Sequence, residues 1–238
     1  MIEARELVKS YGGSRVLNGA SLCVNAGQCV VLTGDNGSGK TSLLHVLVGL
    51  RRADGGQVLW RGRDLTGAGR RQWRAARREW GFLPQQTTLP RRASVRQMLA
   101  FHTRMRGVSI QTARQWLSEV GLADTEHQRV GELSGGMRQR LGIALTLFHE
   151  PNLIVMDEPA ASLDPAWRGA LTDWLQSAAG RGAAVLVTSQ LHETWNGKVR
   201  HCRCEAGRVM EPANESASTS RSQSDHRMET INHKAVEA

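Results

Sequence analysis

The chain has 238 residues, enough for one sizeable domain, and its 40% hydrophobic and 22% charged residues are typical of a globular protein. No apolar run approaches the roughly 18 residues that span a bilayer, and the N-terminus has no apolar signal-peptide core. These features exclude an integral membrane protein and predict a cytosolic one that contacts membranes only through a partner. The net charge of +9, nearly all from arginine, does not by itself select a partner.

The first 83 residues show mostly strand patterns. Loose alternation, turn-forming glycines and short apolar runs predict five strands, over residues 4–8, 16–24, 28–33, 57–60 and 80–83. Leucines at helical spacing predict a helix over residues 42–50, directly after a glycine-rich segment.

That glycine-rich segment matches the pattern G-x-x-x-x-G-K-[ST]. Glycines let the backbone wrap closely around a phosphate chain, and the N–H groups at the start of the next helix point toward phosphate oxygens. Lys40 is predicted to reach the β- and γ-phosphates of a nucleotide, and the Thr41 hydroxyl to ligate Mg²⁺. The predicted ATP-binding residues here are Gly34, Asn36, Gly37, Ser38, Gly39, Lys40, Thr41 and Ser42.

The densest group of basic residues is Arg70, Arg71, Arg74, Arg77 and Arg78. Such a group can bind nucleic acid, lie on an anionic membrane surface, or do neither. We favour the last interpretation, a solvated helical face.

A second glycine-rich segment lies within a helical region over residues 94–150. Leu133-Ser134-Gly135-Gly136 precedes an apolar helix and forms another serine and glycine anion cradle at a helix N-terminus. One nucleotide has a single γ-phosphate, so the second cradle suggests a site that another subunit completes.

Two carboxylates follow the apolar strand predicted over residues 153–156. Adjacent carboxylates there are costly unless they face a cation or water in a cleft. Ligands of nucleotide-binding sheets lie at the carboxyl ends of the strands. Asp157 is therefore predicted to hold Mg²⁺, directly or through water, and Glu158 to polarise the attacking water.

The rest of the chain completes an alternation of strands and helices. A helix is expected over residues 166–179 and a strand over 184–187, which predicts an α/β domain with a mainly parallel sheet and a helical insertion. Residues 211–238 are rich in Ser, Thr, Asn and charged residues without apolar periodicity, so we expect a disordered C-terminal tail.

Taken together, these segments resemble the nucleotide-binding domain of ABC ATPases, over roughly residues 1–210. Gly34 to Thr41 matches Walker A, Leu133 to Met137 the signature motif, and Leu153 to Glu158 Walker B, in the family's order. The resemblance implies a P-loop NTPase core with a mainly parallel sheet, N-terminal antiparallel strands and a helical subdomain at about 86–150. It also implies ATP and Mg²⁺ as ligands.

The resemblance assigns roles to further residues. Gln85 matches the Q-loop, with a part in catalysis and in Mg²⁺ binding, and Asp164 matches the D-loop. Tyr11 stands where the family stacks an aromatic ring on adenine, although it could equally be a core residue. In the family two domains pair head to tail, which would place Ser134 and Gly136 on the γ-phosphate bound to the other domain.

One position departs from the family. Ser189 stands where a histidine that contacts the γ-phosphate is expected. A serine hydroxyl can hydrogen-bond a phosphate oxygen, but it is shorter and cannot become cationic. His192 could substitute if the backbone shifts, although a surface histidine is the interpretation we favour. Catalysis at Ser189 would therefore be slow or assisted by the other subunit, and a nucleotide-binding subunit with weak or no hydrolysis stays an alternative.

The implied function is that of an ATP-hydrolysing motor subunit of an ABC transporter, at the cytoplasmic face of the cell membrane. Its partners would be an integral membrane transporter subunit and a second ATP-binding domain, as a homodimer or with a paralogue. The compact domain and the LSGGMRQR sequence resemble export-type, ABC-2-like ATPases. A soluble ABC ATPase acting on nucleic acid is an alternative, but the chain lacks the long coiled coil or second domain of those branches, so no direct nucleic-acid contact is expected.

Overall fold

The computed structural model describes residues 1–190, 195 and 197–211. His192 and residues 212–238 of the predicted tail lie outside the described residues. Within the described part, no helix is long and apolar enough to cross a membrane.

The N-terminal strands form an antiparallel sheet in the order β2-β1-β4-β5. Its strands are β1 (Ile2–Tyr11), β2 (Ser14–Val24), β4 (Gly55–Trp60) and β5 (Arg63–Asp64). The first two are longer than alternation predicted, because register shifts along β1 interrupt the period-two pattern while the pairing continues. The prediction of antiparallel N-terminal strands is confirmed.

A second sheet has the order β10-β9-β3-β8-β7-β6, and all its pairs are parallel except β9 with β10. Its strands are β3 (Cys29–Thr33), β6 (Trp80–Leu83), β7 (Leu153–Met156), β8 (Ala184–Ser189), β9 (Arg200–Glu205) and β10 (Arg208–Met210). Every residue of β3, β7 and β8 is buried, which is why these strands are continuous apolar runs. The predicted mainly parallel sheet is confirmed.

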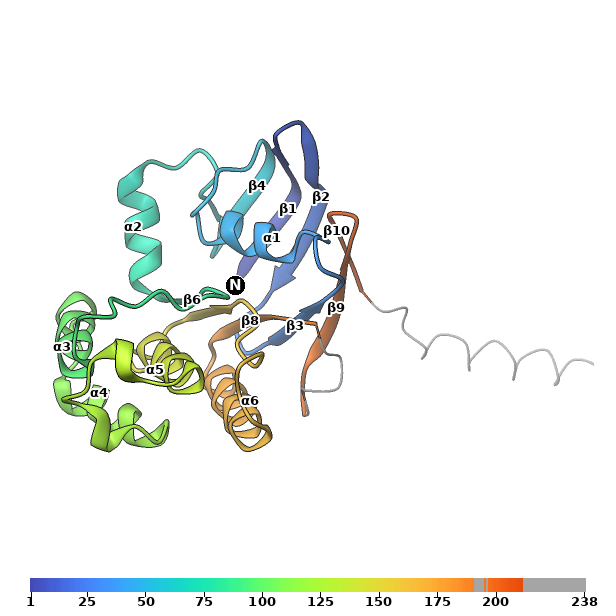
Figure 1. Cartoon of the computed structure of the whole chain (residues 1–238). Helices are drawn as coiled ribbons and strands as arrows, with labels where there is room; N and C mark the ends of the chain where they lie inside the picture. Colours follow the sequence, from blue (N-terminus) through green and yellow to red (C-terminus); the bar gives the residue numbers. More distant parts are fainter. Residues whose placement is uncertain (191–194, 196, 212–238) are drawn as a thin grey trace, which may run out of the picture.

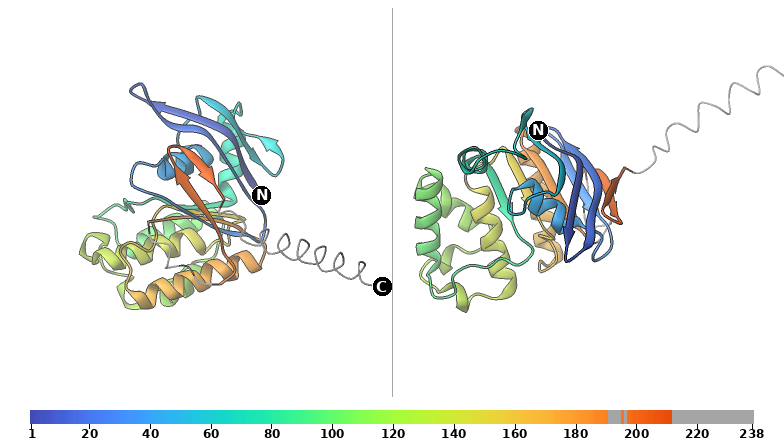
Figure 2. Two further views of the ribbon diagram at one scale, coloured as in Figure 1. Left: turned by 90° about the vertical axis from the view of Figure 1, so that its right-hand side faces the viewer. Right: turned by 90° about the horizontal axis from the view of Figure 1, so that it is seen from above.

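The helices are α1 (Lys40–Leu47), α2 (Arg70–Arg78), α3 (Val95–Arg106), α4 (Ile110–Glu119), α5 (Gly135–Leu147) and α6 (Pro165–Gly180), with short 3₁₀ turns at Ala123–Thr125 and Val130–Glu132. Helices α3, α4 and α5 gather at one side of the molecule, away from β1 and β2 (Figures 1 and 2). The helical pattern predicted over residues 94–150 therefore corresponds to three helices and two turns.

Three apolar clusters hold these layers together. One lies between the two sheets, where α1 packs Leu43 and Leu44 against residues of β1, β2 and β3. A second covers the opposite face of the parallel sheet with α5 and α6, through residues such as Ile143 and Leu171. The third joins α3, α4 and α5. Burial of apolar surface on both sides of the parallel sheet fixes its strand ends in space, and those ends carry the polar residues described next.

Candidate nucleotide-binding site

The glycine-rich loop runs from β3 to α1 and takes backbone conformations that favour glycine. Gly34, Gly37 and Gly39 have φ of 146°, 81° and 111°. A Cβ at Gly34 would collide with the carbonyl oxygen of Cys204, because the loop passes close to β9. The loop therefore curves from β3 to the start of α1 in a conformation that glycines permit. A loop of this kind can wrap its backbone closely around a phosphate group.

Lys40 begins α1 and is buried beneath this loop, 6% exposed. Its Nζ donates to the carbonyl oxygens of Gly34, at 2.6 Å, and of Asp35, at 3.0 Å. These bonds hold the ammonium group inside the loop, where phosphate oxygens would compete for its three donors. The Ser38 Oγ, also buried, has no hydrogen-bond partner among the described residues, as expected of a group that fits an added polar ligand.

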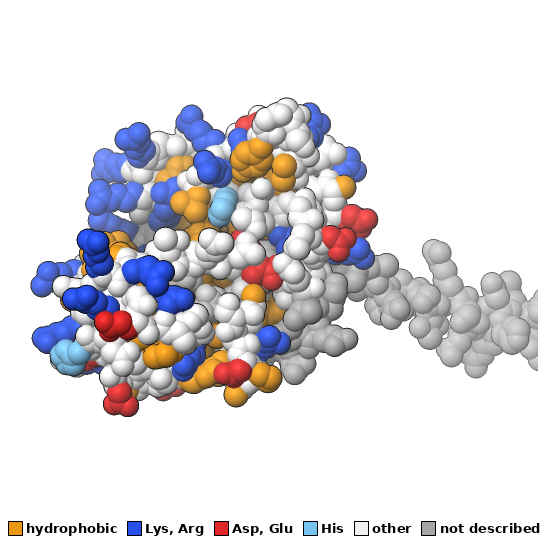
Figure 3. Space-filling model, in the orientation of Figure 1, with side chains coloured by type: hydrophobic (Ala, Val, Ile, Leu, Met, Phe, Trp, Pro, Cys, Tyr) orange, Lys and Arg blue, Asp and Glu red, His pale blue; other side chains and the backbone are white. Residues whose placement is uncertain are grey.

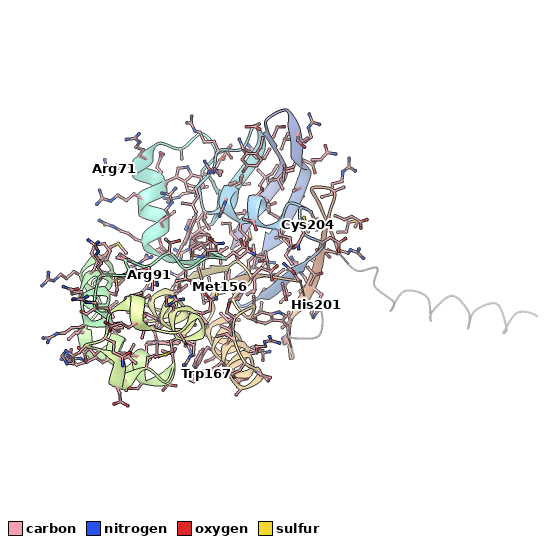
Figure 4. All side chains as sticks on the ribbon, viewed as in Figure 1. Arg71, Arg91, Met156, Trp167, His201 and Cys204 are labelled. Carbon is pink, nitrogen blue, oxygen red and sulfur yellow. The ribbon has the colours of Figure 1, made fainter. Side chains whose placement is uncertain are left out.

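The carboxylates at the end of β7 are fixed by the strands on either side. The backbone N–H of Asp157 donates to the carbonyl of Leu83 at the end of β6. The Thr188 hydroxyl of β8 donates to Asp157 Oδ1 at 2.6 Å and accepts from the Glu158 N–H at 2.9 Å. Figure 4 shows Met156, the last residue of β7, near the centre of the molecule.

Asp157 is fully buried, and its second oxygen, Oδ2, has no hydrogen-bond partner among the described residues. A buried carboxylate oxygen of this kind is costly unless a cation satisfies it. Hard carboxylate and hydroxyl oxygens are the ligands that Mg²⁺ prefers. The residues present therefore fit the predicted Mg²⁺ ion.

Glu158 has a left-handed backbone, with φ of 50°, which costs a residue with a Cβ about 1 kcal/mol. Burial raises the pKa of its carboxyl group above the ordinary 4.5, while the Lys40 ammonium and the N–H of Gln190 act in the opposite direction. That N–H donates to Glu158 Oε2 at 3.3 Å. A carboxylate with a raised pKa is a stronger base, which suits a group that accepts a proton from water.

These groups meet at one cavity of about 190 Å³. It is lined by Val16, Asn36, Gly37, Gly39, Lys40, Thr41, Ser42, Gln85, Glu158 and Gln190. The structure thus brings together most of the predicted ATP-binding residues, the Q-loop glutamine and the predicted general base. Val16 and Gln190 were missed by sequence reasoning, because neither belongs to a motif with a defined residue type.

Five residues predicted for this site do not line the cavity: Gly34, Ser38 and Asp157, which are described above, and Tyr11 and Ser189. Tyr11 ends β1 and is 40% exposed, with Lys9 Nζ 5.5 Å from its ring centroid. Ser189 is buried as the last residue of β8, paired in register with Thr33 immediately before the loop. The sequence placed it after the strand, whereas the strand extends through it because parallel pairing with β3 continues to Thr33. Gln190, the next residue, reaches the loop instead, and its Nε2 donates to Asn36 Oδ1 at 2.8 Å.

The segment predicted to be the signature motif lies apart from this cavity. Ser134 is exposed and is the N-cap of α5, since its Oγ accepts from the Met137 N–H at 3.1 Å. Gly135 and Gly136 form the first turn of α5, and none of these residues lines the cavity. Asp164 is likewise exposed and caps α6 by accepting from the Trp167 N–H.

A buried glutamine connects the two sites. Gln139 of α5 accepts from the Thr87 hydroxyl at 3.0 Å and donates to the carbonyl of Pro159 at 3.0 Å. Thr87 lies two residues after Gln85, and Pro159 directly follows Glu158. The signature helix is therefore tied by side-chain hydrogen bonds to both segments that carry the predicted catalytic residues. Sequence reasoning missed Gln139, since only the packing shows that it is buried.

Comparison with known proteins gives a consistent result. Residues 17–161 match the sequence profile of the ABC transporter family. The chain is 36% identical over 196 residues to Nod factor export ATP-binding protein I of Burkholderia orbicola, covering 81% of this chain and 63% of that protein. It is 31% identical over 191 residues to the lantibiotic transport ATP-binding protein SrtF of Streptococcus pyogenes, covering 80% of each.

Among solved structures, the fold is similar to that of an ATP-binding subunit of an ABC transporter, with a TM-score of 0.82, 23% identity and 93% coverage of both chains. A dimeric bacterial ABC transporter cassette gives a TM-score of 0.81 with 22% identity, over 88% of this chain and 96% of that one. The chain spans less than two thirds of the length of the Nod factor export protein. With a family profile that matches most of its length and a relative matched over four fifths, the chain belongs to the ABC transporter family.

Proposed function

We propose that the chain is the ATP-binding and ATP-hydrolysing motor subunit of an ABC transporter. The observation that carries the proposal is the single cavity at which Lys40, Thr41, Gln85 and Glu158 meet. Its lining residues would supply what phosphoryl transfer needs: cationic and N–H donors for the phosphates, and a basic carboxylate for water. The relatives named as ATP-binding proteins of export or transport systems support the same assignment.

In this proposal the glycine-rich loop binds the phosphates of ATP. Lys40 would exchange its two carbonyl partners for β- and γ-phosphate oxygens, and the buried Ser38 hydroxyl would gain a partner. Thr41, Asp157 and Gln85 would hold Mg²⁺, which neutralises charge on the phosphates when bound. Stacking of adenine on Tyr11 stays a prediction, because Val16, and not Tyr11, lines the cavity.

Hydrolysis requires a water molecule aligned with the γ-phosphate. Glu158 accepts a proton from that water while the water oxygen forms a bond to the γ-phosphorus. The bond between the γ-phosphorus and the oxygen that bridges to the β-phosphate breaks. The products are ADP and inorganic phosphate. Because Ser189 is buried in β8 and Gln190 contacts both Glu158 and Asn36, we assign to Gln190 the positioning of Glu158 relative to the loop.

The exposed signature segment supports a site shared between two chains. Ser134 accepts a bond within its own helix, yet its hydroxyl proton can still be donated to a phosphate oxygen. A second ATP-binding domain would present its loop to Ser134 and Gly136, and the dimeric state of a cassette of similar fold supports such a pairing. Residues 1–210 would form the motor domain, at the cytoplasmic face of the membrane. Closing and opening of the two paired domains would be transmitted to an integral membrane subunit.

The direction we infer is export, in line with the relatives named for Nod factor export and daunorubicin resistance. The names of those relatives mention two different compounds, Nod factor and daunorubicin, and we therefore assign no transported substrate to this chain.

The test compares ATP binding and turnover of wild type and Lys40→Ala. We expect turnover to fall by at least about 100-fold and nucleotide binding to weaken, because the cation that reaches the terminal phosphates is removed. Lys198→Ala changes an exposed lysine outside the cavity and should behave as wild type. Equal turnover in Lys40→Ala and Lys198→Ala would refute the site, and binding without hydrolysis in wild type would favour the alternative of a nucleotide-binding subunit.

A further inference from the structure

Helix α2 has four arginines on one face. At about 100° per residue, Arg70, Arg71, Arg74 and Arg78 fall within an arc of about 100° around the helix axis. The opposite side carries Ala76, which is buried in the cluster between the two sheets. All four arginines are exposed, and we call them the arginine stripe.

The stripe is not needed to attach α2 to the rest of the protein, because other arginines do that. Arg77 donates to the carbonyls of Val48 and Gly49 at the end of α1, and its guanidinium lies 5.4 Å from the Trp73 ring centroid. Arg106 of α3 donates to the Arg77 carbonyl at 2.8 Å, at the C-terminal end of α2. Arg77 lies at the edge of the stripe, about 20° from Arg70 around the helix axis, and its guanidinium contacts the end of α1, whereas the four stripe arginines make no such contact among the described residues.

The positive charge of the stripe is not neutralised within the described part of the chain. None of its four arginines makes an ion pair or a side-chain hydrogen bond there. The carboxylate next to the helix, Glu79, pairs with Arg61 at 2.9 Å. Figure 3 shows basic side chains gathered over the side where α2 and α3 lie, and Figure 4 shows Arg71 extending away from the protein.

The surface near the stripe adds further positive charge. Arg51 and Arg52 are exposed in the turn after α1, two and three residues from the Gly49 carbonyl that Arg77 contacts. They also make no ion pair within the described residues. Like charges held close together repel one another, so an external anionic surface would stabilise this arrangement.

In place of the solvated helical face that the sequence favours, we propose that the arginine stripe lies against the anionic phospholipid headgroups of the membrane that holds the transporter partner. This proposal rests on the proposed function, which places the chain beside a membrane. Guanidinium groups pair bidentately with phosphate oxygens, and a row of them on one helix face can contact several headgroups at once. Juxtamembrane basic clusters are attracted to anionic leaflets in this way.

A bilayer fits the stripe better than single-stranded nucleic acid does. The aromatic residue of α2, Trp73, is partly buried and packs on the core, so the stripe lacks an aromatic face on which bases could stack. The cavity beside α2 is lined by Gln72 and Ala76, which lie opposite the stripe, and by Ala75 between them and Arg71. The stripe itself is therefore an open row of charges that fits an extended anionic surface.

The experiment measures sedimentation of the full chain with phosphatidylcholine vesicles, with and without about 30% phosphatidylglycerol. We expect the anionic vesicles to bind at least about tenfold more tightly than the neutral ones, and less tightly as NaCl rises. The variant Arg70→Gln/Arg71→Gln/Arg74→Gln/Arg78→Gln should lose most of this preference. Its ATP turnover should equal that of wild type, since the stripe does not line the nucleotide cavity.

The matched control replaces four exposed arginines elsewhere, Arg5, Arg181, Arg203 and Arg208, and so removes the same net charge. It should keep most of the vesicle binding if position matters and not only total charge. Equal loss in both variants, or no preference for anionic vesicles in wild type, overturns the proposal. Tighter binding to duplex DNA than to anionic vesicles, lost in the stripe variant, would overturn it in favour of nucleic acid. If wild type hydrolyses ATP but shows no preference for anionic vesicles, this inference fails while the proposed function stands; if wild type neither binds nor hydrolyses ATP, the proposed function fails.

Discussion

The loop that follows β3 and the signature turn that begins α5 are both glycine-rich anion cradles at a helix N-terminus, yet their surroundings differ. Around Lys40, the end of β7 adds two carboxylates, of which Asp157 has an oxygen without a hydrogen-bond partner among the described residues, and Thr188 of β8 holds the other oxygen of Asp157. Ser134 is exposed, and its hydroxyl oxygen caps only its own helix. Anion-binding geometry alone therefore does not make a catalytic site. The strand ends of the parallel sheet add what such a site would need, because they bring the predicted base Glu158 and the predicted Mg²⁺ ligand Asp157 to the same cradle.

The difference between the two cradles also predicts how they work together. Gln139 connects the signature helix by hydrogen bonds to the segments after Gln85 and Glu158. A movement of the signature helix would therefore also displace those two segments. If each cradle is half of a site, two chains must meet head to tail for ATP to be hydrolysed.

The largest effect is expected from Glu158→Gln, which removes the base from the loop site and keeps its shape. Turnover should fall by about 100-fold or more, while ATP binding persists. With ATP and Mg²⁺, the variant should elute as a dimer in size-exclusion chromatography, because the closed state can no longer be resolved by hydrolysis. Glu119→Gln, at an exposed position on α4, is the control. A variant that stays monomeric well above its ATP affinity would contradict the shared site.

The half-site comparison is sharpened by mixing two defective chains. Ser134→Arg should reduce turnover by about tenfold or more, since the cradle that faces the partner's γ-phosphate is blocked. When this variant is mixed with Lys40→Ala in equal amounts, about half of the dimers contain one chain of each kind. Each of these dimers has one intact site of two, so the mixture should recover about a quarter of the wild-type rate. The ATPase assay of the mixture measures this recovery. No recovery would show that the second half-site comes from a different protein.

Restoring the family's histidine tests the position at the end of β8. If the missing imidazole limits turnover, Ser189→His should raise kcat by about tenfold, or about 1.4 kcal/mol of barrier. Steady-state ATPase kinetics would show it, with Ser189→Asn as a control for size. No gain from Ser189→His together with a loss in Gln190→Ala would assign the role to Gln190, which contacts Glu158 and Asn36.

The smallest effect concerns pH. Burial raises the pKa of Glu158 above 4.5, and the carboxyl group must be ionised to accept a proton. The ionised fraction therefore decreases as the pH falls through the raised pKa, and kcat should decline along an acid limb that lies above pH 4.5. A pH profile of kcat measures the limb, and the residual rate of Glu158→Gln should lack it. An acid limb at or below pH 4.5 would show that Glu158 is not the base.

Sequence motifs predicted the loop, the signature turn and the acidic strand end, because each demands particular residue types at fixed spacing. They did not identify Val16, Gln139 or Gln190, whose side chains are not distinctive and whose roles depend on what lies beside them. The bounds of β8 were also missed, since apolar periodicity ends at Val187 while pairing with β3 continues through Ser189.

The sequence by itself determined the family, the α/β class and the residues of the phosphate-binding loop, since local backbone and side-chain chemistry specify them. Only the tertiary structure decided that Gln190, and not Ser189, lines the nucleotide cavity, and that four arginines of α2 share one exposed face without counter-charges. The physical reason is that burial and partnership arise when elements far apart in the chain pack together. A local pattern cannot encode which of two neighbouring residues completes a buried strand and which reaches across to the loop.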